Sequence, residues 1–260
     1  MIQGMLEPLK AAPSEHSQEP REVDLRECFA RVYDQQGLNA SPAHACVDLV
    51  QYFEHRSHGK WIEPSKLFLY KVTRKLLGVV GNTGTDLRTT LKAMVCFGLP
   101  PERYWPYDVE AFDDEPGAFL YSFAKQSQSI RYMRLDSRNA TGSQTLRVVR
   151  SFLAAGLPSV FGFCVPDSLT RESDVPYRRP FDRSRGGQAV VAVGYDDRRR
   201  TGSGKGALLF RNSWGHRWGE DGYGWLPYVY VEEQLAVDFW TIVRPDWLES
   251  DEFMRPRILA

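Results

Sequence analysis

The sequence lacks any long apolar run, any excess of one charge and any N-terminal leader pattern. Its longest apolar candidate, residues 189–194, has the length of a strand, whereas a membrane-spanning helix needs about 18 apolar residues. Basic and acidic residues number 33 each, and a general nucleic-acid binder would carry a basic excess. The N-terminus has no basic start followed by an apolar block, so no secretory signal is predicted. Nucleic acid and membrane are therefore not expected partners.

Cysteine is also scarce. Cys28, Cys46, Cys96 and Cys164 lie far apart and form no CxxC pair. This spacing predicts reduced, mostly buried thiols in a cytoplasmic protein rather than a disulfide framework or a zinc site. Because the chain also has no phosphate-binding loop and no cluster of metal ligands, we expect no cofactor and no metal.

What the chain does have is enough apolar and aromatic residues, 42% and 13%, to bury a large core. The first half predicts helices over residues 41–56, 65–76 and 86–97, because apolar residues recur there at helical spacing. Ser41 is a good N-cap for the first of these helices, and Pro42 suits its first turn.

The second half predicts mainly strands, separated by Gly, Asp and Arg turns. The expected strands cover residues 130–135, 158–165, 188–195, 207–212, 223–226 and 236–243, with one helix over 143–155. We expect an α+β protein whose two lobes enclose a cleft. Its parts are a flexible N-terminal arm (1–22), a mainly helical lobe (23–128), a β-rich lobe (129–245) and a C-terminal tail (246–260).

Two long motifs carry a family resemblance. The run GGQAVVAVGYDD, followed by ALLFRNSWGHRWGEDGYGWLPYVYV, resembles the C-terminal half of papain-like (C1) cysteine peptidases, particularly bacterial cytoplasmic members. Upstream, VDLRECFARVYDQQGLNASPAHA resembles the segment that carries their catalytic cysteine. The resemblance covers about residues 23–243 and implies a papain-like fold, with a helical left lobe and a β-barrel-like right lobe.

The resemblance also assigns positions to the family's catalytic groups. Asn212 matches the asparagine that orients the catalytic histidine, and Trp214 matches the indole that shields that asparagine. Gln35 lies six residues before Ser41, which is the family's offset between its oxyanion glutamine and its nucleophile. The nucleophile position then falls on Ser41 and the histidine position on Gln188. If Gln36 were the oxyanion glutamine instead, the nucleophile position would fall on Pro42, and neither alignment supplies a thiol.

These replacements remove the two groups that perform the chemistry. A serine hydroxyl needs a general base in contact with it, and an amide neither takes nor gives a proton near neutral pH. Papain-type peptide hydrolysis is therefore excluded. Loss of both groups indicates natural divergence rather than a deliberate knock-out, because a second replacement would be redundant. His44, three residues after Ser41, is the one candidate for a substitute base. Cys46 is expected in the core and His216 on a surface loop.

We therefore predict a catalytically inactive papain-like protein that binds a peptide, a protein tail or a partner enzyme in its cleft. In active relatives a loop of the helical lobe hydrogen-bonds an extended peptide, and the matching loop here contains Asn82, Thr83 and Gly84. The alternative is a repurposed enzyme for acyl transfer, ligation or cyclisation in a biosynthetic pathway, using Gln35 and His44.

Overall fold

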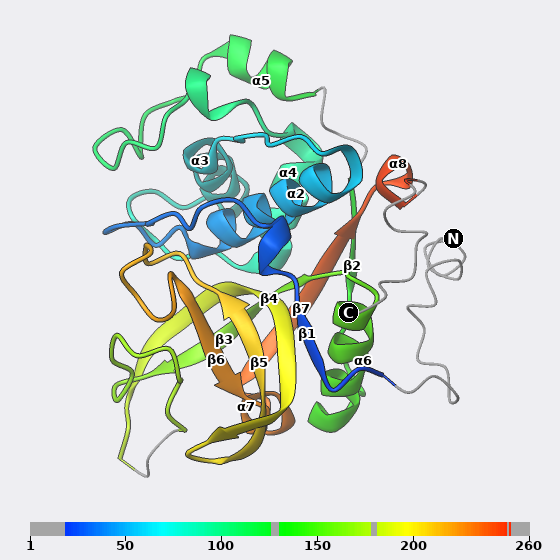
Figure 1. Ribbon diagram of the computed structural model, residues 1–260. Coiled ribbons are helices and arrows are strands. Elements are labelled where there is room, and N and C mark those ends of the chain that lie inside the picture. The colour runs from blue at the N-terminus through cyan, green and yellow to red at the C-terminus, as the bar shows by residue number, and fades with distance from the viewer. Residues whose placement is uncertain (1–18, 126–129, 178–180, 249, 251–260) are drawn as a thin grey trace.

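The computed structural model describes residues 19–125, 130–177, 181–248 and 250. Most of the predicted N-terminal arm and C-terminal tail lies outside these ranges. The described chain forms two lobes, one of helices and one built on a sheet (Figure 1). The helical lobe contains α2 (Ser41–His58), α3 (Lys66–Leu77), α4 (Leu87–Phe97) and α5 (Ala118–Ala124), with short 3-10 turns at Arg26–Cys28 and Glu102–Tyr104.

The helix ends follow from local chemistry. Ser65 caps α3 by accepting a hydrogen bond from the Phe68 N–H, and Asp86 caps α4 in the same way through Thr89. Helix α3 ends at Gly78, whose φ of 67° is the left-handed conformation that glycine adopts easily. The predicted second and third helices are confirmed to within one residue, because their caps and stop signals are all present in the sequence.

The second lobe is an antiparallel sheet whose strands run in the order β2-β7-β3-β4-β5-β6, with β1 paired to β4. Its strands are β1 (Glu22–Asp24), β2 (Arg131–Arg134), β3 (Ser159–Pro166), β4 (Ser184–Thr201), β5 (Gly204–Arg211), β6 (Tyr223–Pro227) and β7 (Ala236–Val243), and its helices are α6 (Gly142–Ala154), α7 (Val229–Glu232) and α8 (Pro245–Leu248). The α+β two-lobed prediction is thus confirmed.

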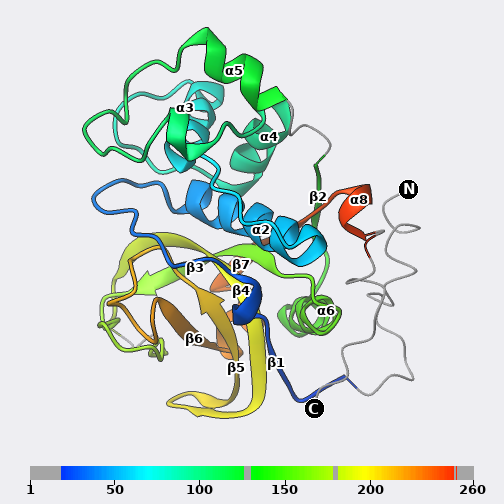
Figure 2. The same cartoon turned by 45° about the horizontal axis from the view of Figure 1, so that its top comes forward.

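Helix α2 joins the two lobes. It lies between the other helices and the sheet (Figure 2), and every residue from Ser41 to Phe53 is buried. A helix buried on all sides must satisfy its polar side chains inside the protein. Asp48 does so through a 2.7 Å ion pair with Arg211, the last residue of β5. This pair fixes the middle of α2 against the sheet.

Several details differ from the sequence expectations. Ser41 is the first residue of α2 rather than its N-cap, which is Ala40, because the Ser41 hydroxyl accepts a hydrogen bond from the sheet instead. Val23 lies in β1 and pairs with Tyr195, so this part of the predicted helical segment belongs to the sheet. The predicted tail begins with α8, whose Trp247 is fully buried and stacks on Phe53 at 5.1 Å.

None of the four cysteines forms a disulfide, and only Cys46 is buried. Cys28 is half-buried, and Cys96 and Cys164 are exposed, so the prediction of mostly buried thiols was wrong. Cys164 is exposed because alternate residues of β3 face opposite sides of the sheet, and its side chain falls on the open side. In the described parts of the chain, no helix is long and apolar enough to cross a membrane.

Candidate active site

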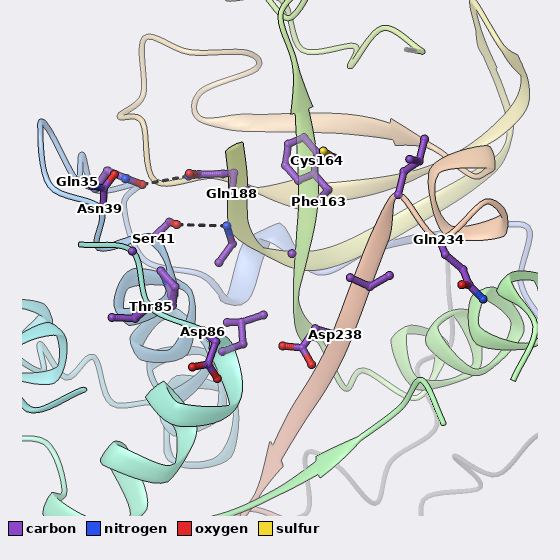
Figure 3. Close-up of a pocket in the computed structure, with 18 residues that line it drawn as sticks. Gln35, Asn39, Ser41, Thr85, Asp86, Phe163, Cys164, Gln188, Gln234 and Asp238 are labelled. Carbon is purple, nitrogen blue, oxygen red and sulfur yellow. Dashed lines mark hydrogen bonds between the residues drawn. The ribbon is translucent and has the colours of Figure 1, made fainter. Parts of the chain in front are cut away.

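Among the residues predicted for the site, Gln35, Ser41 and Gln188 come from both lobes and line one cleft of about 500 Å³ (Figure 3). Gln35 lies on the loop before α2, and Ser41 is the first residue of α2. Gln188 lies on β4, opposite Phe163 of β3, and Asn212 directly follows β5. The backbone N–H of Ala189 donates to Ser41 Oγ at 3.2 Å, so the hydroxyl lies beside the Gln188 position.

The amide of Gln188 is the centre of the site's hydrogen bonding. Its Nε2 donates to Asn212 Oδ1 at 2.9 Å, to Gln35 Oε1 at 3.0 Å and to Ser213 Oγ at 3.2 Å. The bond to Asn212 is one that an imidazole N–H could also make. An amide nitrogen, however, has no basic lone pair with which to accept a proton. Gln188 therefore makes the hydrogen bond to Asn212 but supplies no proton acceptor through its nitrogen.

Two hydrogen-bond donors remain on the wall of the cleft. Gln35 Nε2 uses one hydrogen for Leu38 O at 2.8 Å, and its Oε1 accepts from Ser213 Oγ at 2.6 Å. The amide is thus held in one orientation, with a second hydrogen left for a ligand. The Ser41 hydroxyl accepts from Ala189 and can donate its own hydrogen. A carbonyl oxygen in the cleft would find both donors.

The two alignments place different glutamines at the site, and the two side chains lie in different surroundings. Gln36 is exposed with a φ of 52°, and its backbone N–H donates to Asp34 Oδ1. Gln35 instead is 7% exposed and contacts Gln188. This geometry favours the alignment in which Gln35 is the glutamine of the site and Ser41, rather than Pro42, occupies the nucleophile position.

His44, the candidate for a substitute base, lies in the core rather than at the cleft. Its side chain is 1% exposed and does not line the cleft. Its Nδ1 bonds to Ala40 O at 3.1 Å, and its ring packs edge-on against Tyr107. Burial, with repulsion from Lys66, lowers the pKa of His44 to about 3. A group with that pKa accepts protons poorly at neutral pH. Ser41 and His44, three residues apart on α2, thus lie in different environments, Ser41 at the cleft and His44 in the core.

Burial of His44 predicts a pH dependence of stability. Between about pH 6.5 and pH 3 the unfolded chain binds a proton at His44 and the folded chain does not, so the stability present above pH 6.5 is lost as the pH falls. We expect His44→Asn to lower the slope of the unfolding free energy against pH by about 1.4 kcal/mol per pH unit in this window. Denaturant titrations of both chains at several pH values measure it, and identical slopes would contradict the burial of a neutral imidazole.

The other predicted cleft residues divide into two groups. Gly84 lines the cleft, together with Thr85 and Asp86. Asn82 does not line it, because its side chain holds the neighbouring loop: Oδ1 accepts from the Asn39 N–H at 2.8 Å and Nδ2 donates to Gly37 O at 2.8 Å.

Thr83 and Trp214 also lie outside the cleft lining. Trp214 packs edge-on against Trp218, with ring centroids 5.2 Å apart. It supports the loop that carries Asn212 rather than forming the wall of the cleft.

Sequence reasoning missed several residues of the cleft. Ser213 was inside the quoted motif, and its role in fixing Gln35 could have been suspected from its position beside Asn212. Phe163, Cys164 and Asp238 line the cleft from β3 and β7, and nothing local in the sequence marks them. His216 is exposed and borders a different hollow, formed with residues 30–34.

Comparison with known proteins identifies the family and the fold. The profile of the family described as papain family cysteine protease matches residues 20–231. An uncharacterized peptidase C1-like protein of Acanthamoeba polyphaga mimivirus is 33% identical over 229 residues, which cover 85% of this chain and 71% of that protein. The chain belongs to the papain family.

Solved structures show the same fold. Xylellain, a cysteine protease from Xylella fastidiosa, is 32% identical, with a TM-score of 0.76 and 90% of each chain covered. The bromelain protease of Ananas comosus is 17% identical, with a TM-score of 0.63, 86% of this chain and 99% of that chain covered. The second likeness concerns the fold alone.

Proposed function

We propose that this chain is a non-catalytic member of the papain family that binds an extended peptide or protein tail in the cleft between its lobes. The observation that carries the proposal is the amide of Gln188, which donates to Asn212, Gln35 and Ser213 at the position where the family's chemistry requires a base. With Ser41 at the nucleophile position, the cleft contains neither a thiol to attack at that position nor an acceptor for its proton.

Retention of the cleft supports binding. The loss of the two reactive groups has not closed it, since its walls come from α2, α4, β3, β4 and β7. The free hydrogen of Gln35 Nε2 and the Ser41 hydroxyl can both donate to a backbone carbonyl of an extended ligand. An extended chain offers such carbonyls at regular spacing, and it has the shape that a groove between two lobes accepts.

The alternative, an acyl-transfer or cyclising enzyme, needs a group that moves a proton at the cleft. The proposed substitute base, His44, is buried and hydrogen-bonded to Ala40, which disfavours that role.

A partner enzyme that offers a tail to the cleft is included in the binding proposal. The cytoplasmic location stays a prediction from the sequence.

Peptide binding tests the proposal. Pools of acetylated hexapeptide amides, scanned by position and measured by fluorescence polarisation, should contain sequences that bind the native chain. Ser41→Ala should keep the affinity within about fivefold, because a single neutral hydrogen bond contributes about 1 kcal/mol or less.

A matched variant blocks the cleft. A Cβ on Gly162 would meet no atom closer than 3.9 Å, so β3 has room for the start of a side chain there, and Gly162→Val would fill space in the cleft. It should weaken binding at least about tenfold. Equal binding by Gly162→Val, or labelling of Ser41 by a fluorophosphonate probe, would overturn the proposal.

A further inference from the structure

The helical lobe carries an aromatic face, formed by Trp61, Tyr104, Phe119 and Phe123, outside the cleft. Phe119 of α5 is 61% exposed, Trp61 is 51% exposed and Tyr104 is 40% exposed. None of the four lines the cleft, and Figure 1 draws α5 at the edge of the helical lobe farthest from the sheet. Aromatic side chains are enriched in the buried centres of protein interfaces. A group of them left in water therefore indicates a surface that another protein covers.

Three of the four rings hold one another in place. The ring centroids of Tyr104 and Phe119 are 5.6 Å apart, those of Tyr104 and Phe123 are 5.3 Å apart, and those of Phe119 and Phe123 are 5.8 Å apart. Arg103 covers the Tyr104 ring, with its guanidinium carbon 4.8 Å from the ring centre. Because these side chains already restrict each other, covering them costs little further conformational entropy. The three rings form a preorganised projection.

An apolar hollow of about 540 Å³ lies beside this projection. Trp61 and Phe123 line it, so the hollow and the aromatic face form one continuous surface. An isolated β-bridge between Pro64 and Pro101 joins two loops at the border of the hollow and fixes its shape. The other apolar residues that line it are Val50, Ile62, Leu99 and Ile130. A projection next to a hollow is a shape that fits a second copy of itself across a two-fold axis.

Four charged side chains line the hollow, and two of them satisfy each other. Arg244 Nη1 lies 2.6 Å from Glu54 Oε1. Arg103 is exposed and has no ion-pair partner among the residues that the structure describes. The side chain of Glu63 is 60% exposed, and its one ion pair in the described ranges, with Arg31, is 3.9 Å long. The hollow therefore presents one cation and one anion that lack a close partner.

These two charges favour a second copy over a partner of one charge. A partner of one charge would attract either Arg103 or Glu63 and repel the other. Around a two-fold axis, Arg103 of one copy faces Glu63 of the other, and the reverse pair forms at the same time. The surface is thus complementary to itself in charge as well as in shape.

We propose that the aromatic face binds a second copy of this chain. In the resulting two-fold dimer, Phe119 of each copy enters the hollow of the other, and Arg103 pairs with Glu63 across the contact. The dimer uses none of the residues that line the cleft, so it does not depend on the peptide-binding function proposed above. Each copy keeps its own cleft.

Sedimentation of the full native chain tests the association itself. Between about 1 and 500 µM, a range that includes weak dimers, the mean mass should rise with concentration from one chain to two and stop there. A mass of one chain throughout this range would refute the dimer. Growth beyond two chains would refute the two-fold closure.

A charge exchange tests the pairing across the contact. Arg103→Glu and Glu63→Arg each place like charges opposite one another twice, so each variant alone should raise the dimer dissociation constant at least about tenfold. An equal mixture of the two variants restores opposite charges at both contacts and should form a heterodimer within about threefold of the native affinity. A mixture that associates no better than either variant alone overturns the proposed contact.

The apolar part has its own matched pair of variants. Phe119→Ser should weaken the dimer at least about tenfold, because it removes the ring that enters the hollow. Val80→Ser is the control: Val80 is 83% exposed, lies on the helical lobe and lines neither the hollow nor the cleft, so the dissociation constant should not change. Circular dichroism verifies that both variants fold. Native affinity in Phe119→Ser, or equal losses in the two variants, would assign the association to another surface and overturn the proposal.

Discussion

The double variant Ser41→Cys with Gln188→His is expected to hydrolyse peptides that the native chain only binds. The thiol would start α2 beside the Ala189 N–H, and a histidine at 188 would find Asn212 Oδ1 where Gln188 Nε2 now donates at 2.9 Å. A helix N-terminus and an imidazolium together stabilise a thiolate. We expect a rate at least about 10³-fold above that of the native chain, since general base and nucleophile act as a unit.

The single variants are the controls for this gain. Ser41→Cys alone has no base, and Gln188→His alone has a poor nucleophile, so each should remain near the native background in a fluorogenic peptide assay. Activity in Ser41→Cys alone would mean that another group in the cleft takes the proton. An inactive double variant that still binds peptides and folds would show that more than two groups separate this site from catalysis.

Removal of the buried carboxylate at Asp48 is expected to have the largest effect on stability. Arg211 is fully buried, and its Nε donates to Asp48 Oδ2 at 2.7 Å. Its Nη1 donates hydrogen bonds to the Ala30 carbonyl and the Tyr223 hydroxyl, and its Nη2 donates to the Arg31 carbonyl. Asp48→Ala leaves a buried guanidinium without its counter-charge, which typically costs about 3–5 kcal/mol. Chemical denaturation measures the loss.

An exposed ion pair provides the comparison. Glu115 contacts Lys75 at 2.5 Å on the surface, and Glu115→Ala should cost less than about 1 kcal/mol. Asp48→Asn keeps the shape of the side chain and one hydrogen-bond acceptor, so its loss of stability should lie between those of Asp48→Ala and Glu115→Ala. It replaces Asp48→Ala in the comparison if that variant does not fold. Equal losses in Asp48→Ala and Glu115→Ala would show that the Arg211 pair does not hold the lobes together.

Elements with strong local signals could be predicted from the sequence. Helix α3 has a capping Ser65 and a terminal Gly78, and both ends lie within a residue of the prediction. Strand β4 runs from Ser184 to Thr201 and is longer than its apolar part, because its polar ends pair with β3 and β5. Pairing between strands is a tertiary property that local polarity does not reveal. The cap expected at Ser41 was wrong for the same reason, since the hydroxyl bonds to Ala189 across the lobes.

The site itself was predictable where the family motif fixes the spacing. Gln35, Gln188 and Asn212 were placed by their offsets, and all three meet in one hydrogen-bonded cluster. Asp86 and Asp238 are 152 residues apart and come from different lobes, so only the folded chain brings them to one cleft. The sequence also could not show that His44 turns into the core, because three-residue spacing on a helix does not specify which face is open.

Prolonged incubation of the purified native chain with a mixed peptide library, analysed by mass spectrometry, is the most direct measurement of whether the cleft binds without cutting. With Gln188 at the base position and Ser41 at the nucleophile position, no peptide should be cleaved above the rate in buffer, even at concentrations that saturate binding. Cleavage that disappears when Ser41 alone is replaced by alanine would contradict this conclusion.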